Sequence, residues 1–303
     1  MSKNLKFFLV SLLLSAFFWG GFNVLATNFI LGVKNGKGQL APQNFSAQVL
    51  PQIPPPVIEK EKPEIGAKSA FALSINKNGN EKIIFEKNPD EILPIASLTK
   101  LMTAWVASEY YDPSQLTTMS REAVNEVEDF GQLKVGENLS VENLLYIMLI
   151  ESSNDAARAL SEIIGEKGFV NLMNIEAKSL GLGSTHFVET YGVSPKNYST
   201  ARDFANFSNR LLREKPEIWK ITKNAEYNLY DPDGVFHHTL LSTDELLKEF
   251  PQIIGGKTGF TFEAKGCLII ISKNEQSGKT FVNVILGSDD RFGDMRKLIE
   301  YEL

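Results

Sequence analysis

The sequence predicts an α/β domain in which helices flank an antiparallel sheet and also form a helical lobe. Two observations lead to this fold class. Short apolar runs rich in strand-forming residues lie near both ends of the globular part of the chain, and a long stretch with helical patterns separates them. We therefore expect the outer runs to form the sheet and the middle of the chain to form the lobe.

The first 33 residues are predicted to form a membrane anchor. Lys3 and Lys6 precede an uncharged stretch of 27 residues, Phe7–Val33. A helix of this length reaches about 40 Å, whereas the hydrocarbon core of a membrane is about 30 Å thick. The alternative is a cleaved signal peptide, with an apolar region over Phe7–Trp19 and a small-residue site ending at Ala26. Either interpretation places the rest of the chain on the extracytoplasmic side of the cell membrane, periplasmic or extracellular.

Residues 34–66 are predicted to form a proline-rich linker. They contain six of the 13 prolines of the chain, among glutamine, asparagine, lysine and glutamate residues. Such a segment cannot bury enough apolar surface to fold, so we expect an extended chain that is partly polyproline II. A spacer that lifts a folded domain off a membrane explains this composition, and a ligand for a proline-binding partner is the alternative.

The folded domain is predicted to span residues 67–303 and to begin with a hairpin. Its two strands are Ala70–Ile75 and Lys82–Phe85, and an Asn-Gly pair at positions 78 and 79 lies between them. Two further strands, Gly266–Ser272 and Thr280–Leu286, are joined by a short polar turn. This short connection predicts that the second pair are antiparallel neighbours.

The middle of the domain and its C-terminal end show helical spacing of apolar residues. One apolar stripe begins at Val141, directly after Ser140, which is suited to capping a helix. Another helix is expected to end at the glycine-containing segment Leu180–Gly183. Further helices are predicted over Ala201–Leu212 and Asp290–Leu303.

Composition and charge exclude several classes of protein. Hydrophobic residues make up 43% of the chain and charged residues 22%, which excludes a disordered or collagen-like protein. The net charge of −6 argues against a nucleic-acid partner, because phosphate binding requires a basic face. The single cysteine, Cys267, excludes an internal disulfide and a cysteine-based metal site, and we expect it to be buried in a strand. The three histidines lack the spacing of metal ligands.

The first motif with chemical potential is Ser97-x-x-Lys100. The apolar residues that follow predict a helix beginning near Ser97, so that Ser97 and Lys100 lie one turn apart on the same side. A serine hydroxyl becomes a good nucleophile when a neighbouring base removes its proton, and a lysine can be that base when burial or a helix N-terminus destabilises its cation. The alternative is an ordinary serine cap followed by a solvated lysine.

The second motif is Ser152-Ser153-Asn154, which lies between two predicted helices. There the Ser152 hydroxyl is suited to relaying a proton, and the Asn154 amide is suited to holding a substrate amide. The alternative is that Asn154 or Asp155 simply caps the second helix.

The third motif, Lys257-Thr258-Gly259, shortly precedes a predicted strand. Lys257 and Thr258 are suited to binding a terminal carboxylate there, and the backbone N–H of Phe260 to completing an oxyanion hole. A phosphate-binding loop is disfavoured, because Pro251 occupies the position of the first glycine that such a loop requires.

Taken together, the three motifs agree in order and separation with the set found in penicillin-recognising serine enzymes. The chain resembles the serine-type D-alanyl-D-alanine carboxypeptidases, which are low-molecular-mass penicillin-binding proteins, over about residues 68–302. The resembling segments are Leu93–Thr103, Ile147–Ala157, Gly183–Val188 with Gly192, Tyr198–Asp203 and Gly255–Thr261. The resemblance implies a β-lactamase/transpeptidase-like fold.

The resemblance also implies roles for individual residues. Ser97 would be the acylated nucleophile and Lys100 its base, and Ser152 and Asn154 would form a second wall of the site. Lys257, Thr258, Gly259 and the Phe260 N–H would form the third wall. Arg291 corresponds to an arginine that the family keeps near the substrate carboxylate, and a solvated surface arginine is the alternative.

The implied reaction is removal of the terminal D-Ala from peptidoglycan stem peptides through an acyl-enzyme, with no cofactor and with β-lactams as covalent inhibitors. A D,D-endopeptidase acting on peptidoglycan crosslinks is the main alternative, since family members that lack an extra C-terminal domain include such enzymes. A class A β-lactamase is less well matched, because Ser153 stands in place of an aspartate and Glu189 lacks the following Leu-Asn. A non-catalytic wall-binding protein is the remaining alternative.

Overall fold

A computed structural model describes residues 61–125 and 130–302, all of which belong to one structural unit of the chain. The predicted anchor at residues 1–33 and most of the predicted linker at 34–66 lie outside the described residues. Within the described ranges, none of the helices is both long enough and apolar enough to cross a membrane.

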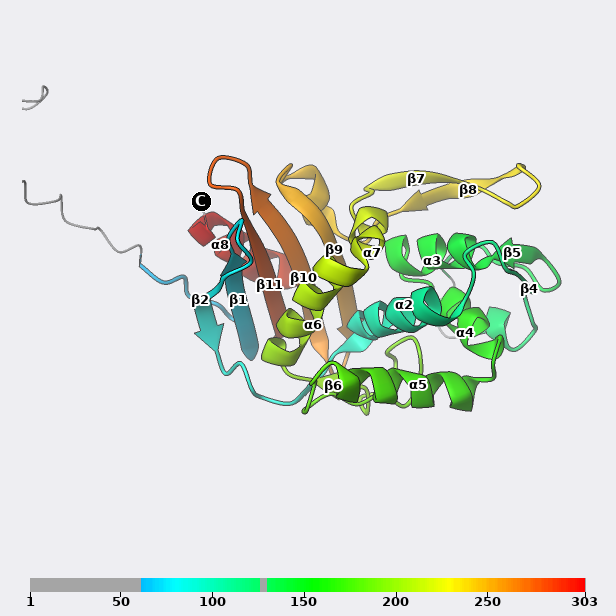
Figure 1. Cartoon of the computed structure of the whole chain (residues 1–303), viewed down its shortest axis with the longest axis horizontal. Helices are drawn as coiled ribbons and strands as arrows, with labels where there is room; N and C mark the ends of the chain where they lie inside the picture. The colour runs from blue at the N-terminus through cyan, green and yellow to red at the C-terminus, as the bar shows by residue number, and fades with distance from the viewer. Residues whose placement is uncertain (1–60, 126–129, 303) are drawn as a thin grey trace, which may run out of the picture. The chain divides into compact units, whose positions relative to one another are not determined.

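A five-stranded antiparallel sheet forms the centre of the unit, in the order β2-β1-β11-β10-β9 (Figure 1). The strands are β1 Ser69–Ile75, β2 Glu81–Lys87, β9 Ile253–Thr261, β10 Lys265–Asn274 and β11 Lys279–Ser288. The predicted hairpin and the predicted C-terminal pair are both confirmed. β1 pairs with β11, with Ala70 opposite Ile285, so the beginning and the end of the domain share one sheet.

Both faces of the sheet are buried, which explains the unbroken apolar run in β10. Leu268 and Ile270 point into the core beneath α8, Arg291–Glu302, whereas Ile269 and Ile271 point into the core shared with the helical lobe. Cys267 is fully buried in this strand, as predicted, and burial raises the pKa of its thiol to about 11. α6, Ala201–Glu214, packs on β1 and β11 (Figure 1).

The helical lobe lies beside the β9 end of the sheet (Figure 1). Its helices are α2 Thr99–Tyr110, α3 Val141–Ile150, α4 Asn154–Glu162, α5 Glu166–Ser179 and α7 Pro216–Thr222, with 3-10 turns η1 Ala96–Leu98 and η2 Ala123–Asn125. A third 3-10 turn, η3 Glu245–Lys248, packs against α8 instead. Two small strand pairs join the lobe helices, β3 Leu93–Pro94 with β6 Tyr198–Ser199 and β4 Leu116–Thr118 with β5 Asn138–Ser140.

The predicted helix boundaries agree with the structure at several ends. Ser140 caps α3 through a reciprocal capping box with Asn143. α5 ends just before Gly181, whose φ of +78° is the left-handed conformation expected after a helix C-terminus. α6 continues to Glu214, two residues beyond the predicted end at Leu212, and Pro216 then starts the next helix.

A hairpin formed by β7, Glu226–Tyr230, and β8, Phe236–Leu241, was not predicted. Most of its side chains are exposed or half-buried, so the sequence lacks the apolar runs that mark the central strands. Its turn is held by the Asp231 carboxylate, which accepts hydrogen bonds from the N–H groups of Asp233 and Val235. The hairpin lies over α3 (Figure 1).

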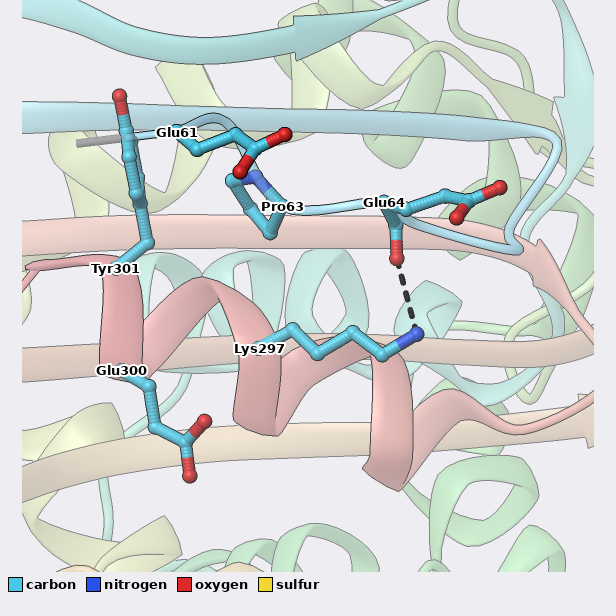
Figure 2. A pocket seen from close by; sticks show the side chains of 6 residues that line it. All are labelled: Glu61, Pro63, Glu64, Lys297, Glu300 and Tyr301. Carbon is cyan, nitrogen blue, oxygen red and sulfur yellow. Dashed lines mark hydrogen bonds between the residues drawn. The ribbon is translucent and has the colours of Figure 1, made fainter. Parts of the chain in front are cut away.

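The chain is packed against α8 slightly before residue 67. Ile65 is buried, the Gly66 N–H donates to Asp294 Oδ1 at 2.8 Å, and Lys297 Nζ donates to the carbonyl oxygen of Glu64 at 2.9 Å. Figure 2 shows the pocket beside this contact, about 530 Å³ in volume, lined by Glu61, Pro63, Glu64, Lys297, Glu300 and Tyr301. The segment that enters the domain is therefore fixed on the sheet face opposite the lobe.

The half-buried Glu302 at the end of α8 gives a prediction about stability. Glu302 accepts hydrogen bonds from Ser272 Oγ and Asn283 Nδ2, and burial raises its pKa to about 7. Because the folded state keeps a proton that the unfolded state releases near pH 4.5, the free energy of unfolding falls as pH rises from about 4.5 to 7. The loss amounts to about 3 kcal/mol.

Glu302→Gln removes this titration while keeping the shape of the side chain and an oxygen that can accept from Asn283. We expect the variant to be more stable than the original protein at pH 8 and similar to it at pH 5. Thermal unfolding at the two pH values measures the difference, and an equal shift at both would contradict the prediction.

Candidate active site

Ser97 lies in the 3-10 turn η1, immediately before α2. The sequence predicts a helix starting near Ser97, and the α-helix itself starts at Thr99, one short turn later. Leu98, Leu101 and Met102 are fully buried in the lobe core and fix the orientation of this segment. Ser97 therefore remains partly exposed at the surface of a rigid element, where it lines a cavity.

Lys100 occupies the first turn of α2 and is fully buried. Its Nζ donates to Ser97 Oγ at 2.9 Å, to Asn154 Oδ1 at 2.7 Å and to the carbonyl oxygen of Tyr191 at 2.7 Å. The alternative of a solvated lysine is therefore wrong. Three fixed oxygens aim the amine at the serine hydroxyl, and burial disfavours its charged form.

The second motif forms the junction between α3 and α4. Ser152 has a φ of +67°, an uncommon conformation for a residue other than glycine, and it turns the chain between the helices. Ser153 caps α4 by accepting from the Ala156 N–H at 3.2 Å. Since Ser153 is the cap, the Asn154 side chain is available to contact Lys100, and the alternative in which Asn154 or Asp155 caps the helix is wrong.

The third motif lies on the edge strand β9, which runs against the nucleophile segment. A side chain at Gly259 would place its Cβ 3.0 Å from the Ser97 backbone nitrogen and 3.2 Å from the Ile95 carbonyl oxygen. A side chain would push the Ser97 turn back by a few tenths of an ångström, so glycine favours the close approach of the strand to the serine. The spacing of Lys-Thr-Gly thus places the residues around Gly259 directly beside Ser97.

Lys257 is buried and points to the second motif. Its Nζ donates to Ser152 Oγ at 2.9 Å and to the Thr258 carbonyl oxygen at 3.1 Å. Burial lowers the pKa of Lys257 well below its usual range, and the nearby cations of Lys100 and Arg291 lower it further, while Asp244 opposes them. The amine therefore gives up a proton far more readily than a surface lysine.

A cavity of about 380 Å³ opens over these motifs. It is lined by Ser97, Phe130, Glu151, Ser152, Thr243, Thr258, Gly259, Phe260 and Arg291. Arg291, the first residue of α8, donates from Nη1 to the Gly259 carbonyl oxygen at 2.9 Å, and Thr258 Oγ1 lies 2.5 Å from Thr243 Oγ1. The alternative of Arg291 as a solvated surface residue is wrong, because the side chain is half-buried at the cavity wall and bonded to the Gly259 carbonyl oxygen.

The structure brings all nine sequence-predicted site residues to this cavity or directly beneath it. Six of them line it: Ser97, Ser152, Thr258, Gly259, Phe260 and Arg291. Lys100, Asn154 and Lys257 lie beneath, with their side chains buried and linked to Ser97 or Ser152. Across residues 61–125 and 130–302, no group of three or more metal-ligating side chains is arranged to hold a metal ion.

Sequence reasoning missed three residues that line the cavity, namely Phe130, Glu151 and Thr243. Glu151 directly precedes the second motif, so its position along the chain is the one available signal. Thr243 reaches the cavity because the segment after β8 runs beside β9, where its hydroxyl contacts Thr258. Phe130 comes from a polar loop whose path no periodic pattern predicts.

Comparison with known sequences identifies a matching family and curated relatives. A family described as D-alanyl-D-alanine carboxypeptidase matches residues 57–290. The D-alanyl-D-alanine carboxypeptidase DacF of Bacillus subtilis is 31% identical over 80% of this chain, and the match covers 64% of DacF. A D-alanyl-D-alanine endopeptidase of Pseudomonas aeruginosa is 32% identical, over 76% of each chain. The chain therefore spans less than two thirds of the first of these relatives.

Solved structures show the same fold. The DD-transpeptidase of Streptomyces K15 superposes with a TM-score of 0.73 at 29% identity, covering 80% of this chain and 98% of that one. A D-alanyl-D-alanine carboxypeptidase of Mycobacterium tuberculosis superposes equally well, with a TM-score of 0.73 at 22% identity, over 82% of this chain and 95% of that one. The predicted penicillin-binding, transpeptidase-like fold is confirmed.

Proposed function

Because the chain belongs to the D-alanyl-D-alanine carboxypeptidase family, we propose that it is a serine D,D-carboxypeptidase that removes the terminal D-Ala from peptidoglycan stem peptides. The observation that carries the proposal is the contact of 2.9 Å between Lys100 Nζ and Ser97 Oγ, made by a fully buried amine. A nucleophile within hydrogen-bond reach of a fixed base is the arrangement that acyl transfer requires.

In the proposed reaction, Lys100 acts in its uncharged form, which burial makes more accessible than in a surface lysine. In that form its Nζ accepts the hydroxyl proton while Ser97 Oγ attacks the carbonyl carbon of the penultimate D-Ala. The resulting oxyanion is stabilised by the Phe260 N–H. The D-Ala amine must gain a proton to leave, and the Ser152 hydroxyl, which accepts from Lys257 Nζ at 2.9 Å, is suited to pass it on. Water then hydrolyses the ester and restores Ser97.

We assign the substrate carboxylate to Arg291 and Thr258. Both line the cavity, whereas the Lys257 amine is buried beneath it and bonded to Ser152. The lowered pKa of Lys257 also suits proton transfer better than anion binding. Lys257, which the sequence predicts as a direct carboxylate contact, then contributes mainly through Ser152. Asn154 accepts from Lys100 Nζ at 2.7 Å and so holds that amine from beneath the cavity.

Endopeptidase activity on crosslinks is the second candidate function. The Pseudomonas aeruginosa relative, which covers 76% of this chain, carries that name. Incubating the enzyme with pentapeptide and with crosslinked muropeptides separates the two functions, because each product has a characteristic mass.

A β-lactamase is disfavoured by the position of Glu189. Glu189, the glutamate considered for the water-activating role of that enzyme, is buried and does not line the cavity. We therefore expect penicillin to acylate the enzyme and to be released slowly.

We also propose that residues 1–33 anchor the enzyme to the cell membrane and that residues 34–66 hold the catalytic domain, residues 67–303, on the extracytoplasmic side. The uncharged length of Phe7–Val33 supports this proposal. The full-length protein should then stay with membranes after a high-salt wash. A soluble species beginning at Thr27 would instead show a cleaved signal peptide.

Carboxylate recognition is tested by comparing two peptides that end in D-Ala-D-Ala, one with a free C-terminal carboxylate and the other with a C-terminal amide. Arg291→Gln should reduce kcat/KM for the acid by about 10- to 150-fold, the value of one charged hydrogen bond, and have little effect on the amide. Lys257→Ala should lower kcat for both peptides. If Lys257→Ala alone removes the preference for the acid, the carboxylate belongs to Lys257.

Penicillin provides the test of the nucleophile. We expect one stable adduct per chain, detected by intact mass and mapped to the peptide that contains Ser97. Ser97→Ala should abolish the adduct, and Lys100→Ala should slow its formation severely. Rapid turnover of penicillin, or an adduct on another serine, would contradict the proposed function.

A further inference from the structure

We propose that Glu189 is a positioning residue for the reacting pair: its carboxylate holds the loop of residues 191–194 so that the Tyr191 carbonyl aims the Lys100 amine at Ser97. The inference rests on the proposed function, because it concerns Lys100 as the base. Glu189 lies below the cavity surface and would act through the loop rather than on the substrate.

The Glu189 carboxylate binds the loop through three backbone N–H groups. Oε2 accepts from the Tyr191 N–H at 2.6 Å and from the Gly192 N–H at 2.8 Å. Oε1 accepts from the Gly192 N–H at 2.9 Å and from the Ser194 N–H at 3.2 Å. Both oxygens are therefore committed to the backbone of one short loop.

This loop touches both members of the reacting pair. The Tyr191 carbonyl oxygen accepts from Lys100 Nζ at 2.7 Å. Gly192, with a φ of +96°, lies so close to the nucleophile segment that a Cβ would be 2.0 Å from the Ala96 carbonyl oxygen and 2.8 Å from the Ser97 nitrogen. A small displacement of the loop would change the position of Lys100 relative to Ser97.

A buried asparagine fixes the position of Glu189 itself. Asn197 Oδ1 accepts from the N–H groups of Val188 and Glu189, at 2.7 and 3.3 Å. Its Nδ2 donates to the Glu189 carbonyl oxygen at 3.0 Å and to Thr99 Oγ1 at 3.1 Å. Thr99 directly precedes Lys100 in α2, so the carboxylate and the base belong to one connected frame.

A carboxylate is needed here because its two oxygens only accept hydrogen bonds. Burial raises the pKa of Glu189, and the loop N–H groups and the Lys100 charge oppose that rise. The amide of a glutamine would direct a donor NH2 group at backbone donors, which would break part of the network. Removing the charge should therefore move the loop without changing the cavity wall at Arg291 and Thr258.

The test compares Glu189→Gln with Glu302→Gln. The control also replaces a carboxylate that accepts hydrogen bonds, on the half-buried Glu302 at the far end of α8, about 16 Å along the helix from Arg291. With a D-Ala-D-Ala peptide, Glu189→Gln should lower kcat by about 10- to 100-fold, as expected for a misplaced catalytic group. KM should change by less than about threefold, since substrate contacts remain. The rate of acylation by penicillin should fall with kcat.

Glu302→Gln should leave kcat, KM and the acylation rate unchanged. If Glu189→Gln does not fold, Glu189→Asp provides the second measurement. The aspartate keeps the negative charge, but its side chain is one methylene shorter, so the carboxylate lies farther from the loop. Its kcat should also fall at nearly constant KM. Unchanged kcat and acylation rate in the folded Glu189 variant, or a loss confined to KM, would overturn the inference. Failure of the proposed function is distinct, since the unmodified protein would then form no penicillin adduct at Ser97.

Discussion

The site depends on the burial of two lysine amines in one polar cluster. Lys100 is fully buried and Lys257 nearly so, and the Lys100 charge helps to lower the pKa of Lys257. Removing an ammonium from water is costly unless fixed oxygens replace the water. Here those oxygens come from Ser97, Asn154 and the Tyr191 carbonyl for Lys100, and from Ser152 and the Thr258 carbonyl for Lys257. The cluster exists only when the sheet and the lobe are assembled.

The sheet and the lobe meet in one specific arrangement because two backbone segments pass very close to the Ser97 turn. β9 on the sheet side and the loop after Glu189 on the lobe side both lie against the turn that carries Ser97, and each does so at a glycine, Gly259 and Gly192 respectively. Larger residues would separate these backbones by shifting the Ser97 turn. The serine is thus clamped between two elements far apart in the sequence, which gives its hydroxyl a fixed orientation toward Lys100.

The sequence predicted the parts of this arrangement that short-range patterns encode. Strand pairs with brief turns, the Ser140 cap and the spacing of Ser97 and Lys100 follow from local chemistry, and the structure agrees with each. The β7–β8 hairpin was missed because its half-exposed strands carry no apolar run. Contacts such as Thr243 with Thr258, or Glu189 with the 191–194 loop, depend on how distant segments pack. A single sequence holds no local pattern for these contacts.

The site has two layers: the residues of one carry out the chemistry, and the residues of the other select the substrate. The buried amines and their oxygens form the lower layer, which any acyl transfer through Ser97 requires. The upper layer includes Phe130 and Phe260, whose side chains are about half exposed, at 48% and 53%, and line the cavity from separate segments. Phe130 lies outside the three motifs, so its identity can change without disturbing the lysine cluster. A carboxypeptidase and an endopeptidase can therefore share the lower layer and differ at the rim, where the substrate beyond the scissile bond must be accommodated.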